Sequence, residues 1–482
     1  MNVLFVTLDQ FRGDSYSAVG HPLVRTPILD RIAAEGVRLS RHYSQAAPCS
    51  PGRAAIYTGT YQMNNRVVAN GTPLRSDLEN MAIVARRAGF DPTLFGYTDQ
   101  GIDPNRASGD DDPRLESYDG ILPGFSIGLY LPESQAGWIH ELRARGFQVP
   151  SGWAPALRGE AERPAEISLS AFLTTRFLEW LGMQESGWFA HLSYLRPHPP
   201  YVAAGEFSKM YEPADVALPI SPSEPEKRHS IHEIALGLPG VSAPTNLDDL
   251  RRIKAQYFGM ISEVDSQLGR VVRAIEDRGE WGETLVVVTS DHGEQLGDHG
   301  LLEKLGFFPQ SYHVIGLWRD PRSGDAGRVV ERFTENIDLL PSLAQAMGEQ
   351  PPVQCDGRTL QTLFADPDCD WRNSAHYEWD FRNFFLNRVT SRWPMDRTLS
   401  RQNLAVSLND STAYVQFGDG TFRCFDLAAD PTWRTEVTDD GVVLRAAQEQ
   451  LLWRQEHMDR KLTDMLLSPG RPGRWPSELL TS

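Results

Sequence analysis

The sequence predicts an α/β protein in which a mixed, mainly parallel sheet is sandwiched by helices, with a smaller antiparallel sheet near the C-terminus. Short apolar, β-branched runs alternate with helix-like stretches, and the runs Val3 to Leu8 and Leu285 to Thr289 each lead into acidic residues. Continuous apolar runs of this length are typical of strands buried on both faces. Past residue 370, strand-like runs are separated by Asn-Asp and Gly-Asp-Gly turns, which predicts the small sheet.

The alternation begins with a helix between Thr26 and Gly36. Thr26 supplies a cap, Pro27 stands at the first helical position, and Gly36 provides a stop. Further elements are expected in chain order: a helix from Leu78 to Ala88, a strand around Leu94, a helix from Leu169 to Leu181, a strand from Phe189 to Tyr194, and a long helix from Leu247 to Arg278.

The C-terminal part is expected to fold separately from the first 370 residues. We predict a catalytic α/β domain over residues 1–370 and a subdomain over residues 371–482. The subdomain is expected to contain strands from Leu404 to Leu408, Ala413 to Phe417 and Phe422 to Leu427, an amphipathic helix from Val443 to Leu466, and an extended arm from Ser468.

Length and composition indicate a folded protein throughout. The chain has 482 residues, of which 40% are hydrophobic and 23% charged, so it can bury a substantial core. It carries 47 basic and 64 acidic residues, a net charge of −17. A surface of this charge repels nucleic acid and anionic lipid, so neither is an expected partner. An anionic substrate would need a local positive site.

The cytoplasm is the expected compartment. No run approaches the roughly 18 apolar residues that a membrane span needs. The segment from Met1 to Asp9 lacks a basic region and a small-residue cleavage site, and it leads directly into the first expected strand.

The segment from Cys49 to Gly59 predicts a short helix with a reactive residue at its start. We expect Pro51 at the first helical position, Cys49 just before the helix, Arg53 about one turn in, and Gly59 as the stop. The N-terminus of a helix offers free N–H groups and a positive dipole end to an anion. Cys49 is therefore placed where a nucleophile would meet an oxyanion.

Two strand ends carry residues that suit a metal ion. Asp9 follows the first expected strand, and Asp291 and His292 follow the strand that ends at Thr289. In a parallel sheet these ends can be neighbours, at the edge where α/β proteins bind ligands. Two carboxylates and an imidazole suit a divalent cation such as calcium, manganese or zinc, and without one the carboxylates would repel each other.

Two further residues are candidates for acid–base or electrostatic roles. His198 lies between prolines in Arg196-Pro-His-Pro-Pro, and a stiff backbone suits a histidine that donates a proton at neutral pH. An ordinary loop histidine is the alternative. Lys304 follows Asp291 closely along the chain, and a surface lysine is its alternative.

These motifs together resemble the formylglycine-dependent sulfatases of the alkaline phosphatase superfamily, and among them the phosphonate monoester hydrolases and arylsulfatases. Cys-x-Pro-x-Arg is similar to the signature whose cysteine a dedicated enzyme oxidises to formylglycine. The resemblance runs from Asn2 to about Arg460. It rests on Asp9-Gln10, the segment from Cys49 to Gly59, the segment from Tyr194 to Tyr201, the segment from Thr289 to Asp298, and Lys304.

The resemblance implies an alkaline-phosphatase-like fold and a role for each motif residue. Asp9, Asp291, His292 and the modified Cys49 would bind one divalent ion, with Gln10 as a fourth side-chain ligand or a partner of the ligands. His198 and Lys304 would contact the transferred group or the leaving oxygen. It also implies maturation by a formylglycine-generating enzyme, and a C-terminal extension used for assembly into a homo-oligomer, a dimer or a tetramer.

The sequence also departs from these families around residue 97. Many arylsulfatases carry a Lys-x-His pair here, whereas this chain has Tyr97, Thr98 and Asp99. Phosphonate monoester hydrolases share the tyrosine but have a hydroxyl residue in place of Asp99. Asn70 matches an asparagine near their substrate, with a plain turn residue as the alternative. We therefore expect Asn70, Tyr97 and Asp99 to line a pocket that favours monoanionic groups over dianions.

The function expected from the sequence is metal-dependent hydrolysis of sulfate monoesters, phosphonate monoesters or phosphodiesters. Hydrated formylglycine is a geminal diol, so one oxygen can attack sulfur or phosphorus and the other can later expel the product. His198 would protonate the departing alcohol, and Arg53 and Lys304 would take up charge. Two alternatives are a sulfuryl or phosphoryl transferase, which needs an acceptor-alcohol site, and a catalytically silent metal-binding assembly protein.

Overall fold

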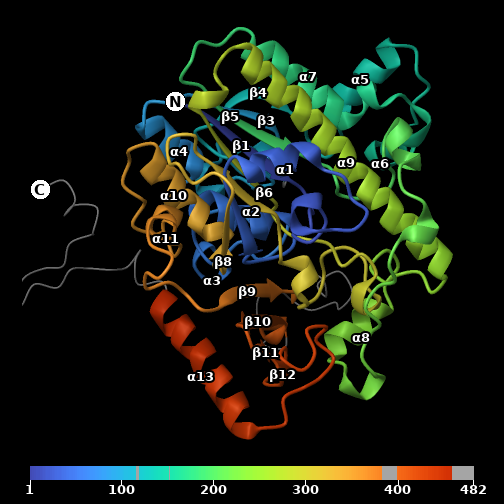
Figure 1. Ribbon diagram of the computed structural model, residues 1–482, viewed down its shortest axis with the longest axis vertical. Helices are drawn as coiled ribbons and strands as arrows, with labels where there is room; N and C mark the ends of the chain where they lie inside the picture. Colours follow the sequence, from blue (N-terminus) through green and yellow to red (C-terminus); the bar gives the residue numbers. More distant parts are fainter. Residues whose placement is uncertain (116–118, 151, 383–398, 459–482) are drawn as a thin grey trace, which may run out of the picture.

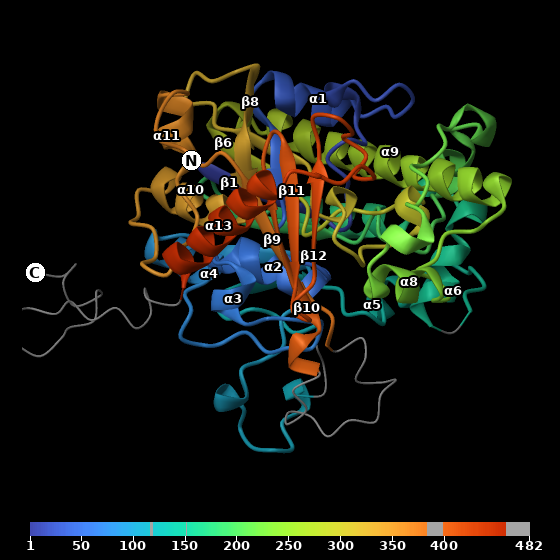
Figure 2. The same ribbon diagram turned by 90° about the horizontal axis from the view of Figure 1, so that it is seen from below.

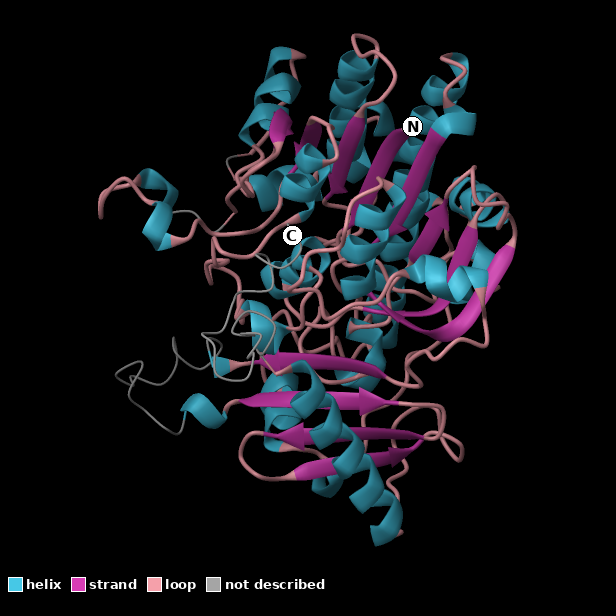
Figure 3. Cartoon of the chain, turned by 90° about the vertical axis from the view of Figure 1, so that its left-hand side faces the viewer, coloured by secondary structure: helices cyan, strands magenta, loops and turns pink. Residues whose placement is uncertain are grey.

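An eight-stranded sheet forms the centre of the computed structural model, which describes residues 1–115, 119–150, 152–382 and 399–458. The strand order is β4-β3-β5-β1-β6-β7-β2-β8. Figure 3 shows the strands in magenta, with the helices packed around them in cyan. Every neighbouring pair is parallel except those that involve β7, which runs antiparallel to β6 and β2. The predicted mixed, mainly parallel sheet is confirmed. Its strands are β1 (Asn2–Leu8), β2 (Val37–Tyr43), β3 (Pro92–Gly96), β4 (Ser126–Tyr130), β5 (Phe189–Tyr194), β6 (Thr284–Thr289), β7 (Gly316–Arg319) and β8 (Arg328–Glu335).

Helices cover both faces of this sheet (Figure 1). Because side chains alternate along a strand, Leu4 and Val6 of β1 enter one apolar core, while Val3 and Phe5 enter the other. The first core is completed by α1 (Pro27–Ala34), α5 (Ala136–Ala144), α6 (Trp153–Arg158), α7 (Leu169–Leu181) and α9 (Leu247–Asp277). The second is completed by α2 (Cys49–Thr58), α4 (Met81–Arg87), α10 (Leu339–Ala346) and α11 (Leu360–Ala365).

A four-stranded antiparallel sheet lies beside the large one, in the order β12-β11-β10-β9 (Figure 2). One face shares an apolar cluster with α8 (Ser230–Leu236) and with Tyr312 and Phe333 of the larger part. The other face packs against α13 (Asp440–His457) through Tyr414, Cys424 and Ala446. The strands are β9 (Ala375–Asp380), β10 (Asn403–Leu408), β11 (Thr412–Phe417) and β12 (Phe422–Asp426).

The small sheet lies where the sequence predicts it, and it follows residue 370. The division into domains at that residue stays a prediction, because the two sheets share a core. The predicted end of the last helix, from residue 459 to Leu466, and the arm from Ser468 lie outside the described residues. None of the helices in the described ranges combines the length and apolar character needed to cross a membrane.

Several predicted boundaries shift because of local capping. The helix expected from Leu78 begins at Met81, since the side chain of Asn80 accepts hydrogen bonds from the N–H groups of Ala82 and Ile83. The last helix begins at Asp440 instead of Val443, because Asp439 caps it in the same way. Helix α2 begins at Cys49, so this residue is its first helical residue and not the residue before it.

The pairing of β1 with β6 determines where the polar residues meet. The two strands are parallel and adjacent, with Thr7 opposite Thr289. The residues that follow both strands therefore leave the same edge of the sheet side by side. The expectation that these strand ends are neighbours is confirmed, and α2 packs against the same edge.

We predict that Gly52→Ala destabilises the protein and displaces the start of α2. A Cβ atom at Gly52 would lie 2.3 Å from the backbone oxygen of Asp291, which is closer than real contacts allow. Overpacking of this kind costs about 1–3 kcal/mol, so urea denaturation should show a loss of that size in the free energy of unfolding.

Gly137→Ala is the matched control. Gly137 is also helical, and its Cβ atom would meet only a ring carbon of Phe172 at 3.9 Å. That variant should keep its stability. Unchanged stability in Gly52→Ala would contradict the close packing of α2 on the strand end.

Candidate active site and metal centre

Four chemically active side chains meet at the edge formed by β1 and β6. Asp9 follows β1, Asp291 and His292 follow β6, and Cys49 is the first residue of α2. One ligand atom of each lies within 4.8 Å of the others, and all four residues are buried. The structure thus brings together the residues that the sequence assigns to one ion. Their role as ligands stays a prediction.

Individual atoms in this cluster suit a divalent cation. Asp9 Oδ1 is buried and accepts no hydrogen bond from any described residue. His292 donates from Nδ1 to the carbonyl of Gly293 at 3.0 Å, so the lone pair of Nε2 faces Cys49 Sγ at 3.2 Å. Nε2 also lies 3.9 Å from carboxylate oxygens of Asp9 and Asp291. A histidine whose tautomer is held by a backbone carbonyl is the usual form of a metal ligand.

The guanidinium of Arg53 donates hydrogen bonds to both carboxylates of the cluster. Its Nε donates to Asp291 Oδ2 at 2.9 Å, and its Nη2 donates to Asp9 Oδ2 at 3.2 Å. Its Nη1 donates to Ser193 Oγ at 2.8 Å, and the ring of Tyr97 lies 4.2 Å from its carbon. Arg53 is fully buried and does not line the cavity. It holds the carboxylates in place, and its role in taking up charge on the transferred group stays a prediction.

Charge compensation fixes the ionisation of Asp9, the acidic residue that follows β1. Although burial disfavours its charge, the positive charges of Arg53 and Lys304 hold the pKa of Asp9 well below its ordinary value. Burial, together with the carboxylate of Asp9, raises the pKa of the Cys49 thiol well above its ordinary value.

The N-terminus of α2 is partly capped from within the protein. Ser50 N–H donates to Asn70 Oδ1 at 3.0 Å, Pro51 has no N–H, and Gly52 N–H donates to the carbonyl of Pro48 at 3.1 Å. The expectation of free N–H groups is wrong at these three positions. Asn70 therefore acts as a cap, and it also lines the cavity. Because its oxygen is engaged, the amide nitrogen is the end left for a ligand.

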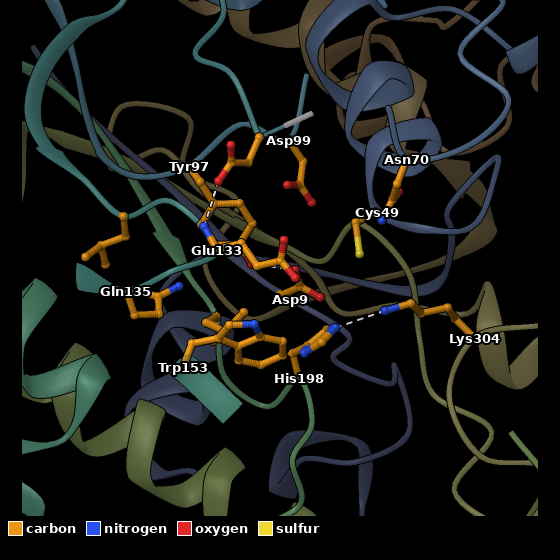
Figure 4. A pocket seen from close by; sticks show the side chains of 13 residues that line it. Asp9, Cys49, Asn70, Tyr97, Asp99, Glu133, Gln135, Trp153, His198 and Lys304 are labelled. Atoms are coloured by element: carbon orange, nitrogen blue, oxygen red, sulfur yellow. Dashed lines mark hydrogen bonds between the residues drawn. The ribbon is translucent and has the colours of Figure 1, made fainter. Parts of the chain in front are cut away.

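Lys304 and His198 form a pair on the opposite side of the cavity from the helix (Figure 4). Lys304 Nζ donates to His198 Nε2 at 3.0 Å, and His198 Nδ1 donates to the carbonyl of Pro199 at 2.8 Å. Burial and the neighbouring ammonium lower the pKa of His198. Although burial disfavours its charge, neighbouring acidic groups raise the pKa of Lys304 above its ordinary value. The imidazole is therefore neutral here, and Lys304 carries the charge.

The side chain of Gln10 links this pair to the strand end. Its Oε1 accepts from Lys304 Nζ at 3.1 Å, and its Nε2 donates to Glu294. Glu294 also accepts from Tyr201 Oη at 2.9 Å and from the N–H of Glu303 at 2.7 Å. Gln10 is thus held by partners at both ends of its amide, while its role as a ligand stays a prediction.

A cavity of about 100 Å³ opens onto Cys49 and Asp9. Tyr97 and Asp99 line it, as the sequence predicts, and Tyr97 donates from its hydroxyl to Asp9 Oδ2. Burial, together with the charges of Asp9 and Asp291, raises the pKa of Asp99 to about 7, despite the guanidinium of Arg53 4.0 Å away. The remaining lining residues are Asn70, Asp119, Leu131, Glu133, Gln135, Trp153, Leu195, His198 and Lys304.

Sequence reasoning missed several residues of this site. Glu294 lies inside the motif that begins at Asp291, yet its role depends on contacts that only the fold creates. Arg196 holds the loop that carries His198, because it donates to the carbonyls of His198 and Pro200 and pairs with buried Glu160. Glu133, Gln135 and Trp153 belong to no motif, and no local signal in the sequence points to them.

Comparison with known proteins identifies the family. The model of the family described as Sulfatase matches residues 1–349. The chain belongs to the sulfatase family. Among curated relatives of this sulfatase-family chain, the multifunctional alkaline phosphatase superfamily protein PehA of Trinickia caryophylli is 35% identical, over 97% of this chain and 98% of its own.

Solved structures agree with this assignment. A phosphonate monoester hydrolase of Agrobacterium radiobacter superposes on the sulfatase-family chain with a TM-score of 0.86 at 38% identity, over 98% of this chain and 100% of its own. Phosphonate monoester hydrolase SpPMH from Silicibacter pomeroyi gives a TM-score of 0.86 at 32% identity, over 98% and 99% of the two chains. The alkaline-phosphatase-like fold is confirmed.

We predict that Asp9→Asn and Asp291→Asn each weaken the binding of a divalent ion by more than about 100-fold. Mutation of a residue that only holds a metal ligand in place already lowers metal affinity roughly 10- to 100-fold, and loss of a ligand itself should cost more. A ligand that binds only the folded state raises the melting temperature. Chelation should therefore lower the Tm of the parent, whereas the variants should show little response to chelator or added metal.

Metal content per chain and Tm are the two readouts. Asp77→Asn is the control, because Asp77 pairs with Arg75 on the exposed surface. Full metal content in Asp291→Asn would contradict the placement of the ion at this strand edge.

Proposed function

We propose that the chain is a metal-dependent hydrolase of monoanionic esters that uses a formylglycine made from Cys49. Its substrates would be sulfate monoesters such as aryl sulfates, phosphonate monoesters and phosphodiesters. One observation carries the proposal: residue 49 begins α2 among Asp9, Asp291 and His292, and it faces the Lys304–His198 pair across a cavity. The phosphonate monoester hydrolases at 38% and 32% identity support the same class of ester.

The metal would be held by Asp9, Asp291, His292 and residue 49, with Gln10 as a fifth candidate. Oxygen and nitrogen donors of this kind suit calcium, manganese or zinc. A divalent ion bound there would favour the ionised form of a hydroxyl beside it and would neutralise charge on the ester. Arg53 holds the two carboxylates toward the ion through Asp9 Oδ2 and Asp291 Oδ2.

Residue 49 would act as the nucleophile in its oxidised and hydrated form. One hydroxyl of the geminal diol attacks sulfur or phosphorus, and the second expels the product by cleavage of the C–O bond. No water then has to attack a crowded centre. The unmodified thiol is a poor nucleophile at this position, because burial and Asp9 raise its pKa.

Lys304 and His198 would interact with the oxygen atoms of the ester, Lys304 with the transferred group and His198 with the departing alcohol. Lys304 is charged and reaches into the cavity, so it stabilises negative charge that develops on the transferred group. An anionic ester beside the imidazole raises the pKa of His198, which allows it to carry the proton that the departing alcohol needs.

Two other functions remain as competing proposals. A sulfuryl or phosphoryl transferase would need a second alcohol in the cavity, and product analysis with added alcohol acceptors distinguishes it from a hydrolase. A catalytically silent metal-binding assembly protein would not need the Lys304–His198 pair. The presence of that pair in the cavity therefore favours an enzyme.

The cellular setting is also proposed. A formylglycine-generating enzyme would be the partner in maturation, the cytoplasm the compartment, and a homo-oligomer, a dimer or a tetramer, the assembled form. The net charge of −17 argues against nucleic acid and anionic membranes as partners.

We predict that the peptide containing Cys49 is found at least partly as formylglycine, and so lighter than encoded. Cys49→Ala should remove nearly all turnover but keep the fold, because it deletes a nucleophile and little volume. Mass spectrometry of the digested protein and assays with nitrophenyl sulfate and nitrophenyl phenylphosphonate provide the test. Full activity from a wholly unmodified thiol would contradict the proposal.

We predict that His198→Ala slows esters of poorly acidic alcohols by roughly 100-fold or more, while nitrophenyl esters lose less. The reason is that nitrophenolate leaves without much protonation. Rates for a series of phenols of increasing pKa, measured in the parent and the variant, provide the test. A uniform loss across the series would remove His198 from the role of general acid.

We predict that monoanionic esters are better substrates than phosphate monoesters, which carry nearly two negative charges at neutral pH. Asp99 faces the cavity and carries negative charge above its pKa of about 7. Asp99→Asn should therefore improve phosphate monoesters several-fold relative to sulfate esters, with the larger effect above pH 7. Faster turnover of phosphate monoesters in the parent would overturn the charge argument.

A further inference from the structure

The cavity has a second wall that the proposed chemistry does not use. Glu133 and Gln135 lie in the turn between β4 and α5, and Trp153 is the first residue of α6. All three line the same cavity as Cys49 and lie across it from Asn70 (Figure 4). Among the described residues, no hydrogen bond joins these three side chains to Asp9, Cys49, Asp291 or His292, or to the Lys304–His198 pair. This group, Glu133, Gln135 and Trp153, is called the outer wall below.

The charges around the cavity are unevenly distributed. Lys304 lies on one side, beside His198. Asp99 and Glu133 lie on the other, and Asp119 beside them is engaged with the N–H of Glu133. If the anionic group of an ester lies between Cys49 and Lys304, the alcohol part of that ester extends toward the acidic residues Asp99 and Glu133. A neutral alcohol gains nothing from that charge, whereas a cationic one is attracted by it.

Gln135 independently indicates that a ligand binds at the outer wall. Only 3% of the residue is exposed, and its Oε1 accepts no hydrogen bond from any described residue. A buried amide oxygen without a donor is unfavourable in the folded protein. A donor on a ligand in the cavity would satisfy it, so the atom is placed to accept an N–H or O–H from the substrate.

Trp153 adds an aromatic surface to the same wall. Its indole lines the cavity close to His198, where Figure 4 shows it beside the imidazole. Indole is the aromatic group that attracts cations most strongly. A carboxylate, an amide oxygen and an indole together therefore match a protonated amine, which offers positive charge and N–H donors at once.

We propose that the outer wall binds the alcohol part of the ester and selects alcohols that carry a protonated amine. The proposal rests on the hydrolase function above and defines its substrate class more narrowly: zwitterionic esters, with the anionic group at Cys49 and the ammonium group at Glu133, Gln135 and Trp153.

The test compares two aryl sulfates of nearly equal shape. The 4-(2-aminoethyl)phenyl ester carries an ammonium group where the 4-propylphenyl ester carries a methyl group, and the two phenols have similar acidity. The 4-(2-hydroxyethyl)phenyl ester offers a donor without charge. We expect kcat/KM to favour the ammonium ester over the propyl ester by about tenfold or more, with the hydroxyethyl ester between them.

Variants of the outer wall test whether its residues cause the preference for the ammonium ester. Glu133→Gln should reduce the ratio of the ammonium to the propyl ester several-fold, because only the charge is removed. Gln135→Met should lower kcat/KM of both donor-bearing esters relative to the propyl ester. Glu179→Gln, on the exposed face of α7, is the control for a change of net charge and should leave the ratio unchanged.

The possible failures are distinguishable. Equal turnover of the ammonium and propyl esters by the parent, or an unchanged ratio in Glu133→Gln, would overturn the proposal and leave the hydrolase function standing. If the parent hydrolysed none of the three sulfates and none of the corresponding phenylphosphonates, the proposed hydrolase function would fail, and this proposal with it.

Discussion

The structure depends on two carboxylates that the pairing of β1 with β6 forces together inside the protein. Asp9 and Asp291 are at most 1% exposed, and Arg53 is the guanidinium that contacts both. Buried charge without compensation is costly, and one guanidinium offsets only one of the two. Lys304 supplies a further positive charge nearby, and Asp9 Oδ1, which accepts no hydrogen bond from any described residue, is the atom at which the proposed metal ion would bind. Residue 49 and His292 also present their ligand atoms within 4.8 Å of those of the two carboxylates.

This constraint also explains the arrangement of the neighbouring elements. Gly52 allows α2 to approach the backbone of Asp291, which places residue 49 against the cluster. Asn70 then caps the helix, so the start of α2 is fixed by packing on one side and by a hydrogen bond on the other. The loop with His198 is held separately by Arg196. Residue 49 and His198, the proposed nucleophile and proton donor, are thus held by separate contacts, across a cavity that is cationic at one side and acidic at the other.

Much of the fold could be predicted because its central strands are mostly apolar and are buried on both faces. Residues Val3 to Leu8, Phe189 to Tyr194 and Leu285 to Thr289 are such strands, and they are the ones that carry the catalytic motifs. Strands β2 and β8 escaped prediction, since arginines and glutamates interrupt their apolar pattern, and β4 and β7 are only five and four residues long.

The residues of the site also divide into those that the sequence predicts and those that it does not. Asp9, Cys49, Asp291 and His292 follow strands or begin a helix, so sequence position alone indicates that they meet. The sequence identifies Arg53 as a residue of the site but does not predict its contacts. Its hydrogen-bond partners lie on or just after three different strands, β1, β5 and β6, which only the fold brings together. Glu133, Gln135 and Trp153 come from a turn and a short helix, and only tertiary packing brings them to the cavity.

The central question is whether residue 49 attacks the ester and then releases it through a second hydroxyl on the same carbon. Cys49→Ser retains one hydroxyl and lacks the second, so it should attack a nitrophenyl phenylphosphonate but fail to release the product. Intact-mass spectrometry after mixing should show a stable phenylphosphonyl adduct at residue 49, accompanied by a burst of about one nitrophenol per chain and no further turnover. Steady turnover at the parent's rate without an adduct would contradict the mechanism.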